Sequence, residues 1–193
     1  DRAEVDLDPS IDIHDKRVYD KARENLNKMI DNGEYIQDEM PCLYIYRQIM
    51  NGRSQTGIVF CASIDDYLNN VIKKHEFTRA DKEQDRINHV DYCDANTGPI
   101  FLTYKEDQIA SEIIEAWIEN ESKRKPIYNF TAEDGITHIV WVIDNDIIIS
   151  ELIDLFKEVD YLYIADGHHR SASAVKVGLK RRKEHPDYTG DEE

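Results

Sequence analysis

The residues Asp166-Gly-His-His-Arg170 place an acid, a glycine, two imidazoles and a guanidinium in direct succession. The apolar run before them, 161–165, predicts a short buried strand, and the residues from Ser171 to about Lys183 predict a helix. Gly167 permits a sharp turn with positive φ, and the amides that open the next helix have no partners within it. A phosphate there would meet free N–H groups, the helix dipole and the fork of Arg170. The junction therefore predicts an anion site.

The side chains of this junction suggest different roles. The candidate phosphate-binding residues are Gly167, His168, His169, Arg170 and Ser171. Asp166, at the strand end, is suited to hold a metal, to orient a histidine or to take a proton from a hydroxyl. From the residues alone, an ordinary Asp-Gly turn with Arg170 paired to an acid is the alternative. Two adjacent histidines are poor evidence for a metal site, because neighbours on a helix lie about 100° apart.

A second charged stretch runs from Lys73 to Arg86. Thr78 followed by Asp81 resembles a capping box, so we expect a helix over residues 79–90. One interpretation is a solvated helix laced with ion pairs. The other is a functional set that includes Glu76, Arg79 and Asp81, which could hold a phosphate and position a hydroxyl.

Three stretches together carry a resemblance to a known family: 163–174, 73–86 and 97–102. Through them the chain closely resembles, over nearly its whole length, a mostly bacterial family named only domain of unknown function one thousand and fifteen. The Asp-Gly-His-His-Arg segment also resembles the phosphate-binding element of the ParB and sulfiredoxin superfamily. That superfamily includes ADP- or ATP-dependent free-serine kinases that carry the same five residues.

The resemblance implies nucleotide phosphate binding first and phosphoryl transfer second. It implies that residues 167–171 cradle the phosphates and that Arg79 stabilises charge on the transferred group. Glu76 or Asp166 would then orient or deprotonate a hydroxyl on a small-molecule acceptor. Such catalysis is mainly positioning and charge neutralisation, so ADP or ATP with Mg²⁺ is the expected cofactor.

Two other functions remain open at this point. The same phosphate cradle could act as a nucleotide-gated switch without phosphoryl transfer, as ParB-like proteins use CTP, and this would require a partner surface such as a homodimer. The third hypothesis is a metal-dependent hydrolase that uses Asp166, His168 and His169 with His75 or His89. The spacing of these ligands gives the hydrolase the least support.

Composition excludes several classes of protein. The net charge of −16 disfavours general binding to nucleic acid or to anionic membranes, which need clustered lysine and arginine. No apolar run approaches the ~18 residues of a membrane span, and no signal peptide is evident, so we expect a cytoplasmic protein. The three cysteines lack Cys-x-x-Cys spacing, which favours reduced thiols. The chain also lacks a P-loop, a Gly-x-Gly-x-x-Gly fingerprint and a Gly-x-Ser-x-Gly elbow.

The pattern of elements predicts a single α/β domain with a mixed sheet, hairpins and flanking helices. We expect it to be a piece of a longer protein, with an extended entry over 1–14 and a polar tail over 186–193. Expected helices are 15–32, 79–90, 107–121 and 146–159. Expected strands are a hairpin of 42–50 and 56–64 around Asn51-Gly52, a buried strand 100–104, and a hairpin of 127–130 and 137–143 around Asp134-Gly135. In helix 107–121, the residues expected to point inward are Ile109, Ile113, Ile114, Trp117 and Ile118.

Overall fold

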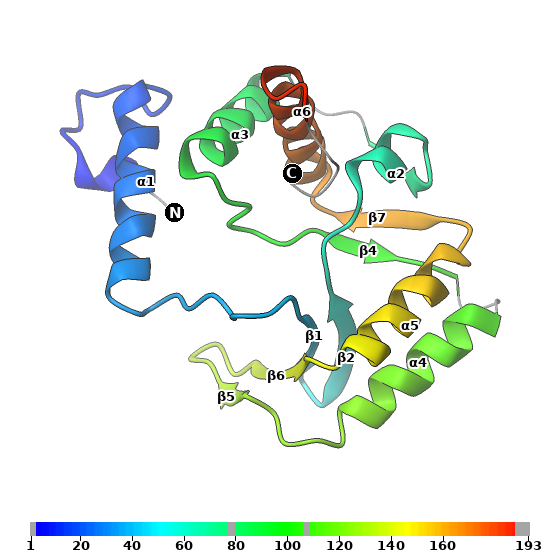
Figure 1. Ribbon diagram of the computed structural model, residues 1–193. Coiled ribbons are helices and arrows are strands. Elements are labelled where there is room, and N and C mark those ends of the chain that lie inside the picture. Colours follow the sequence, from blue (N-terminus) through cyan, green and yellow to red (C-terminus); the bar gives the residue numbers. More distant parts are fainter. Residues whose placement is uncertain (1–2, 77–79, 106–108, 188–193) are drawn as a thin grey trace. The chain divides into compact units, whose positions relative to one another are not determined.

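The computed structural model describes residues 3–76, 80–105 and 109–187 (Figure 1). Within these residues the chain forms six α-helices and two β-sheets, which confirms the mixed α/β class. The chain divides into two compact units. The first comprises 1–37, 64–103 and 163–193, and the second comprises 38–63 and 104–162.

The second unit contains a four-stranded antiparallel sheet in the order β2-β1-β6-β5. Its strands are β1 (Leu43–Met50), β2 (Arg53–Val59), β5 (Tyr128–Thr131) and β6 (Thr137–Ile143), and its helices are α4 (Ile109–Glu121) and α5 (Asp146–Lys157). Both predicted hairpins are present. Asn51 and Gly52 have φ values of 52° and 78°, so the first turn consists of these two residues, and Met50 lies opposite Arg53. The register continues to Tyr44 and Val59.

The core of the second unit lies between one face of the sheet and helices α4 and α5. Ile45 on β1 lies opposite Trp141 on β6, and both are buried together with Ile114. The prediction that Ile109 and Ile113 point inward was wrong, because their side chains are 78% and 40% exposed. The inward face of α4 instead repeats every three or four residues through Ala110, Ser111, Ile114, Ile118 and Glu121.

Two matched substitutions can test which face of α4 packs against the sheet. Ile114→Val removes one methyl group from a fully buried side chain and should lower the free energy of unfolding by about 1 kcal/mol. Ile109→Val makes the same chemical change at an exposed position of the same helix and should have almost no effect. Urea unfolding of both variants would check this. Equal losses would contradict the orientation of α4.

The first unit combines helices with a three-stranded sheet in the order β3-β7-β4. Its elements are a 3₁₀ helix (Ala3–Asp6), α1 (Lys16–Asp31), α2 (Ile64–Leu68), β3 (Ile72–Lys73), α3 (Ala80–Cys93), β4 (Phe101–Thr103), β7 (Leu162–Asp166) and α6 (His168–Glu184). The 3₁₀ helix falls in the segment for which an extended conformation was expected. The prediction that the strand near Ile100 is buried was wrong. Strand β4 pairs only with β7 at the sheet edge, and Phe101 is 45% exposed.

Helix α3 packs against both α1 and α6 (Figure 1). On the α1 side, Val18 and Ala22 bury apolar surface with Cys93 and the N-terminal Ala3. On the α6 side, the contact is polar. The ammonium group of Lys176 donates to the buried carboxylate of Glu83, and the Ser173 hydroxyl donates to the Glu83 carbonyl oxygen at 3.3 Å. These contacts fix α3 beside the helix that begins at the Asp-Gly-His-His-Arg segment.

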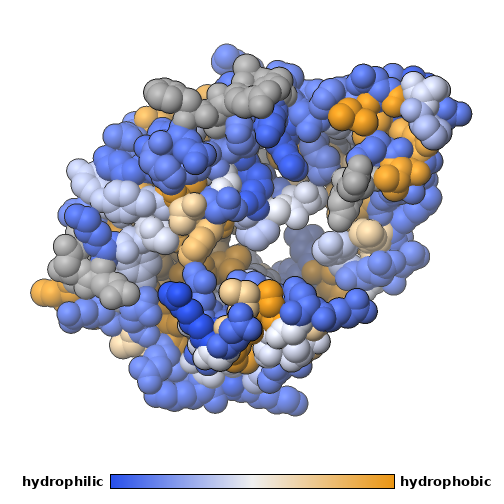
Figure 2. Space-filling view, turned by 180° about the vertical axis from the view of Figure 1, so that it is seen from behind, coloured by the Kyte–Doolittle hydropathy of each residue, from blue (hydrophilic) through white to orange (hydrophobic). Residues whose placement is uncertain are grey.

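The surface agrees with the acidic composition. Hydrophilic residues cover most of the face seen in Figure 2, and hydrophobic residues there form separate groups. None of the described helices combines the length and the apolar composition that a bilayer span requires.

Candidate functional site

The predicted strand-turn-helix is present at the centre of the candidate site. Strand β7 ends at Asp166, Gly167 has φ 96° and ψ 31°, and α6 begins at His168. A Cβ atom at Gly167 would lie 3.0 Å from Cγ2 of Ile100 and 3.2 Å from Nε of Arg170. Both the left-handed backbone and this close packing therefore require glycine.

Helix α6 begins earlier than the expected Ser171, so both histidines and Arg170 form its first turn. The N–H of Ser171 donates to the Gly167 carbonyl oxygen at 2.9 Å and is the first to bond back along the helix. The Ser171 hydroxyl donates to the same carbonyl oxygen at 3.1 Å. Ser171 is buried and its hydroxyl therefore helps to close the turn. Gly167, the N-cap residue, has no side chain to cap the N–H groups of His168, His169 and Arg170, which follow it.

Arg170 is held in place by two oxygen atoms from different elements. Its Nη2 donates to Oδ2 of Asp166 at 2.5 Å, and its Nη1 donates to the carbonyl oxygen of Pro99. A Cβ atom at Gly98 would lie 3.5 Å from Nη1, so the loop passes directly over the guanidinium. The predicted residues Asp166 and Arg170 thus meet, and guanidinium donors remain for a further acceptor.

The two imidazoles are positioned differently from Arg170. His168 is 7% exposed, and its Nε2 accepts the backbone N–H of His75 at 3.5 Å. The rings of His75 and His168 meet edge to face, with their centroids 4.3 Å apart. Nδ1 of His168 lies 3.8 Å from Oε2 of Glu76. Nδ1 of His169 is buried and has no hydrogen-bond partner among the residues that the structure describes.

The structure therefore brings Glu76 to the Asp-Gly-His-His-Arg segment through His168. The predicted residue Arg79 and the side chain of the predicted residue Asp81 lie outside the described part of the chain.

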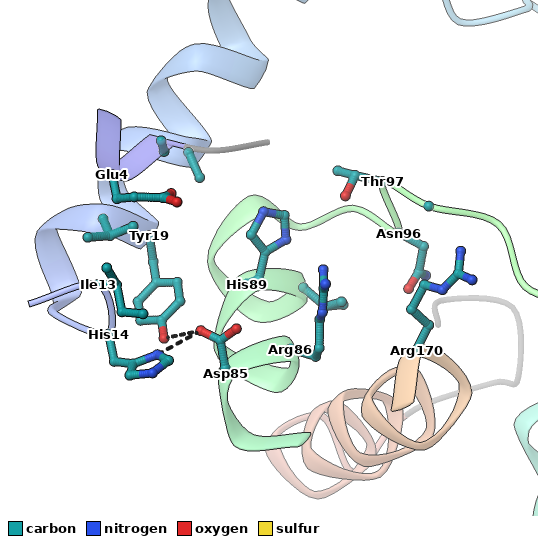
Figure 3. A pocket seen from close by; sticks show the side chains of 15 residues that line it. Glu4, Ile13, His14, Tyr19, Asp85, Arg86, His89, Asn96, Thr97 and Arg170 are labelled. Carbon is teal, nitrogen blue, oxygen red and sulfur yellow. Dashed lines mark hydrogen bonds and ion pairs between the residues drawn. The ribbon is translucent and has the colours of Figure 1, made fainter. Parts of the chain in front are cut away.

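Beside Arg170 the first unit has an open pocket of about 650 Å³ (Figure 3). Helix α3 contributes Arg86 and His89, the loop before β4 contributes Asn96, Thr97 and Gly98, and α6 contributes Arg170. The opposite wall comes from the N-terminal segment and α1, and the wall residues include Ala3, Glu4, Ile13, His14, Val18, Tyr19 and Ala22. Neither His168 nor His169 lines this pocket.

The carboxylate of Asp85, next to Arg86 in sequence, contacts two residues of the N-terminal wall of the pocket. The Tyr19 hydroxyl donates to Oδ1 of Asp85 at 2.8 Å, and Nδ1 of His14 lies 3.2 Å from the same oxygen (Figure 3). Burial is the larger cause, and the hydrogen bond to Asp85 the second, of a rise in the pKa of Tyr19 to about 12. The hydroxyl therefore keeps its proton and remains a hydrogen-bond donor. Arg86 has no hydrogen-bond or ion-pair partner within residues 3–76, 80–105 and 109–187.

Comparison with known families gives one result. The family model described as protein of unknown function (DUF1015) matches residues 1–193. The chain belongs to the DUF1015 family. The match confirms the resemblance to this family alone, and it assigns no activity. Searches of curated proteins and of solved structures found no match.

Sequence reasoning identified part of the DUF1015 pocket. Asp85 and Arg86 were expected only as charged residues of one helix, and His89 was considered besides as a possible ligand of the metal-dependent hydrolase. The available signal was the spacing of Arg86 and His89, which places them on one face of a helix. Their position opposite Arg170 depends on the packing of α3 against α6.

The arrangement gives no support to the metal-dependent hydrolase. Among the described residues of this DUF1015 chain, no three His, Cys, Asp or Glu side chains gather as metal ligands. His75 and His168 are in contact, but Asp166 is paired with Arg170, and His89 lies on the wall of the pocket.

We expect His89 to make the stability of this chain depend on pH. Burial, and next the charge of Arg86, hold the pKa of His89 below its usual 6.5. As the pH falls below 6.5, the unfolded chain binds the proton before the folded chain does, so the stabilisation present above that pH is lost. Between about pH 7 and about pH 5, the urea midpoint of the wild type should therefore fall more steeply than that of His89→Gln. If the urea midpoints of the wild type and His89→Gln changed in parallel with pH, His89 would have the same pKa in the folded and unfolded chain.

Proposed function

We propose that this DUF1015 chain binds nucleotide phosphate at the turn between β7 and α6. The observation that carries the proposal is the left-handed Gly167, with the Arg170 guanidinium packed against it at the edge of a pocket. The N–H groups of the first turn of α6 precede the first helical bond and lie at the positive end of the helix dipole. Arg170 adds a planar cationic donor fixed by Asp166 and Pro99.

We further propose that the bound nucleotide donates a phosphoryl group to a small hydroxyl acceptor. The acceptor oxygen would bond to the terminal phosphorus as the bond to the bridging oxygen breaks, releasing AMP from ADP or ADP from ATP. The hydroxyl proton would pass to Glu76 or Asp166. The family resemblance gives Arg79 the role of stabilising charge on the transferred group.

The residues at this turn are compatible with Mg²⁺ that enters with the nucleotide. Proteins commonly hold Mg²⁺ through one or two carboxylates together with substrate phosphates. The side chain of Asp166 is 74% exposed and is the carboxylate of the turn. A bound Mg²⁺ ion would neutralise phosphate charge.

A nucleotide-gated switch without phosphoryl transfer is the second candidate. Both candidate bases already have cationic or potentially cationic neighbours, because Asp166 pairs with Arg170 and Glu76 lies 3.8 Å from His168. Each carboxylate therefore already has a contact within the chain. Such a switch requires a surface that closes on a partner when the nucleotide binds. We expect this partner to be a second copy of the chain, in a homodimer.

Two measurements separate these functions. Thermal unfolding with ADP, ATP and CTP, with and without Mg²⁺, should show a nucleotide-dependent rise in Tm under either function. Transfer of labelled phosphate to free serine or another small hydroxyl compound should occur only with the phosphotransferase. No rise in Tm and no saturable binding with any of the three nucleotides would refute the proposed phosphate site.

A further inference from the structure

We propose that the pocket between α1, α3 and α6 binds the whole nucleotide, with Arg86 as a second phosphate-binding residue and the N-terminal wall against the base. This inference rests on the proposed function and extends it to residues outside the Asp-Gly-His-His-Arg segment. Its evidence is the charge, shape and lining of the pocket.

The charge evidence is that Arg86 has no ion-pair partner among the residues that the structure describes. Four basic residues of α6 form ion pairs: Lys176 with Glu83, Lys180 with Asp91, Arg181 with Asp94 and Arg182 with Asp65. Arg86 has no such partner in the described part of the chain. Its neighbour Asp85 is already bound by Tyr19 and His14. Glu4 also lines the pocket, on its N-terminal wall. A guanidinium that lines a pocket and has no bonded acid among the described residues favours an anionic ligand.

Two arginines from different helices line this pocket. Arg86 extends from α3 and Arg170 from α6, and both line one pocket with Asn96 and Thr97 (Figure 3). His89, also on this wall, has a pKa lowered by burial and by Arg86. At neutral pH the cationic charge therefore comes from the two arginines. Consecutive phosphates of a nucleoside diphosphate could contact one guanidinium each.

The remaining wall suits the nucleoside part. Across the pocket from Arg170, the N-terminal segment and α1 provide the side chains of Ile13, Val18 and Ala22 and the ring of Tyr19 (Figure 3). Ligand pockets usually have volumes of about 300–1,000 Å³, and this pocket has about 650 Å³. An anionic end joined through a polar sugar to a flat aromatic base is the chemistry of a nucleoside phosphate.

Calorimetric titration of the whole chain with ADP and with inorganic phosphate tests this inference. Arg86→Ala should weaken ADP binding about 10- to 100-fold, because it removes charge-assisted hydrogen bonds to a phosphate. Ile13→Asn, at a pocket residue that is 58% exposed, should weaken ADP binding about five-fold and leave phosphate binding unchanged. The matched control is Lys82→Ala, which removes an exposed cation from α3 outside the pocket and should leave ADP affinity within about two-fold.

The outcomes distinguish this inference from the function on which it rests. If the wild type binds ADP but either Arg86→Ala or Ile13→Asn binds it with wild-type affinity, the inference is overturned while the phosphate site at Arg170 stands. If the wild type binds no ADP, the proposed function fails and the inference fails with it. Circular dichroism of each variant shows whether a loss of affinity comes from misfolding.

Discussion

Arg170→Ala is expected to lower the affinity for ADP by at least about 100-fold and to remove the nucleotide-dependent rise in Tm. The guanidinium combines a permanent charge with several donors in one plane, and the carbonyl oxygen of Pro99 and the carboxylate of Asp166 fix its position. Alanine removes the charge and the donors and leaves the carboxylate of Asp166 facing the incoming phosphate. Calorimetric titration with ADP measures the change directly.

A variant of the same helix controls for the loss of charge. Arg182 pairs with Asp65 and does not line the pocket, so Arg182→Ala should bind ADP like the wild type. Arg170→Lys keeps the charge without the planar fork and should give an intermediate affinity. ADP affinity in Arg170→Ala equal to that in Arg182→Ala would show that the phosphate lies elsewhere.

Gly167→Ala is expected to lower the free energy of unfolding by about 3 kcal/mol and to abolish ADP binding. The left-handed φ of 96° costs an alanine about 1–2 kcal/mol. Overpacking adds about 1–3 kcal/mol, because the new Cβ would lie 3.0 Å from Ile100 and 3.2 Å from the Arg170 guanidinium. The same contacts would displace Arg170 from the pocket. Urea unfolding and ADP titration measure the two effects separately.

Gly33 provides the matched control in the same unit. It also has a positive φ, 73°, but a Cβ atom there would meet nothing within 4 Å. Gly33→Ala should therefore cost only the backbone term of about 1 kcal/mol and leave ADP binding intact. Equal losses of stability in the two variants would mean that the contacts with Ile100 and Arg170 do not constrain the turn.

The elements that were predicted correctly depend on local signals. Asn51-Gly52 defined a two-residue hairpin turn, and Asp134-Gly135 marked the second hairpin. Helix α1 (Lys16–Asp31) lies within the expected helix 15–32, and Asp15 caps it by accepting the N–H of Arg17. The strand-turn-helix at Gly167 was also found, because a single glycine between an apolar run and an alanine-rich run leaves few alternatives.

The features that were missed depend on contacts between distant segments. Ile109 is as apolar as Ile114, and only the packing of α4 on the sheet decides which of them is buried. His168 turns toward His75 and Glu76, whereas Arg170 turns toward the Pro99 carbonyl oxygen and the pocket. The pairing of Arg86 with Arg170 in one pocket requires α3 to lie against α6, which no local pattern specifies.

A crystal structure of the chain with ADP tests the phosphate site most directly. The account predicts phosphate oxygens within hydrogen-bonding distance, about 2.7–3.2 Å, of backbone N–H groups of His168–Arg170 and of the Arg170 guanidinium. A nucleotide bound with its phosphates away from this turn, while Arg170 still holds Asp166 and Pro99 as in the free chain, would contradict it.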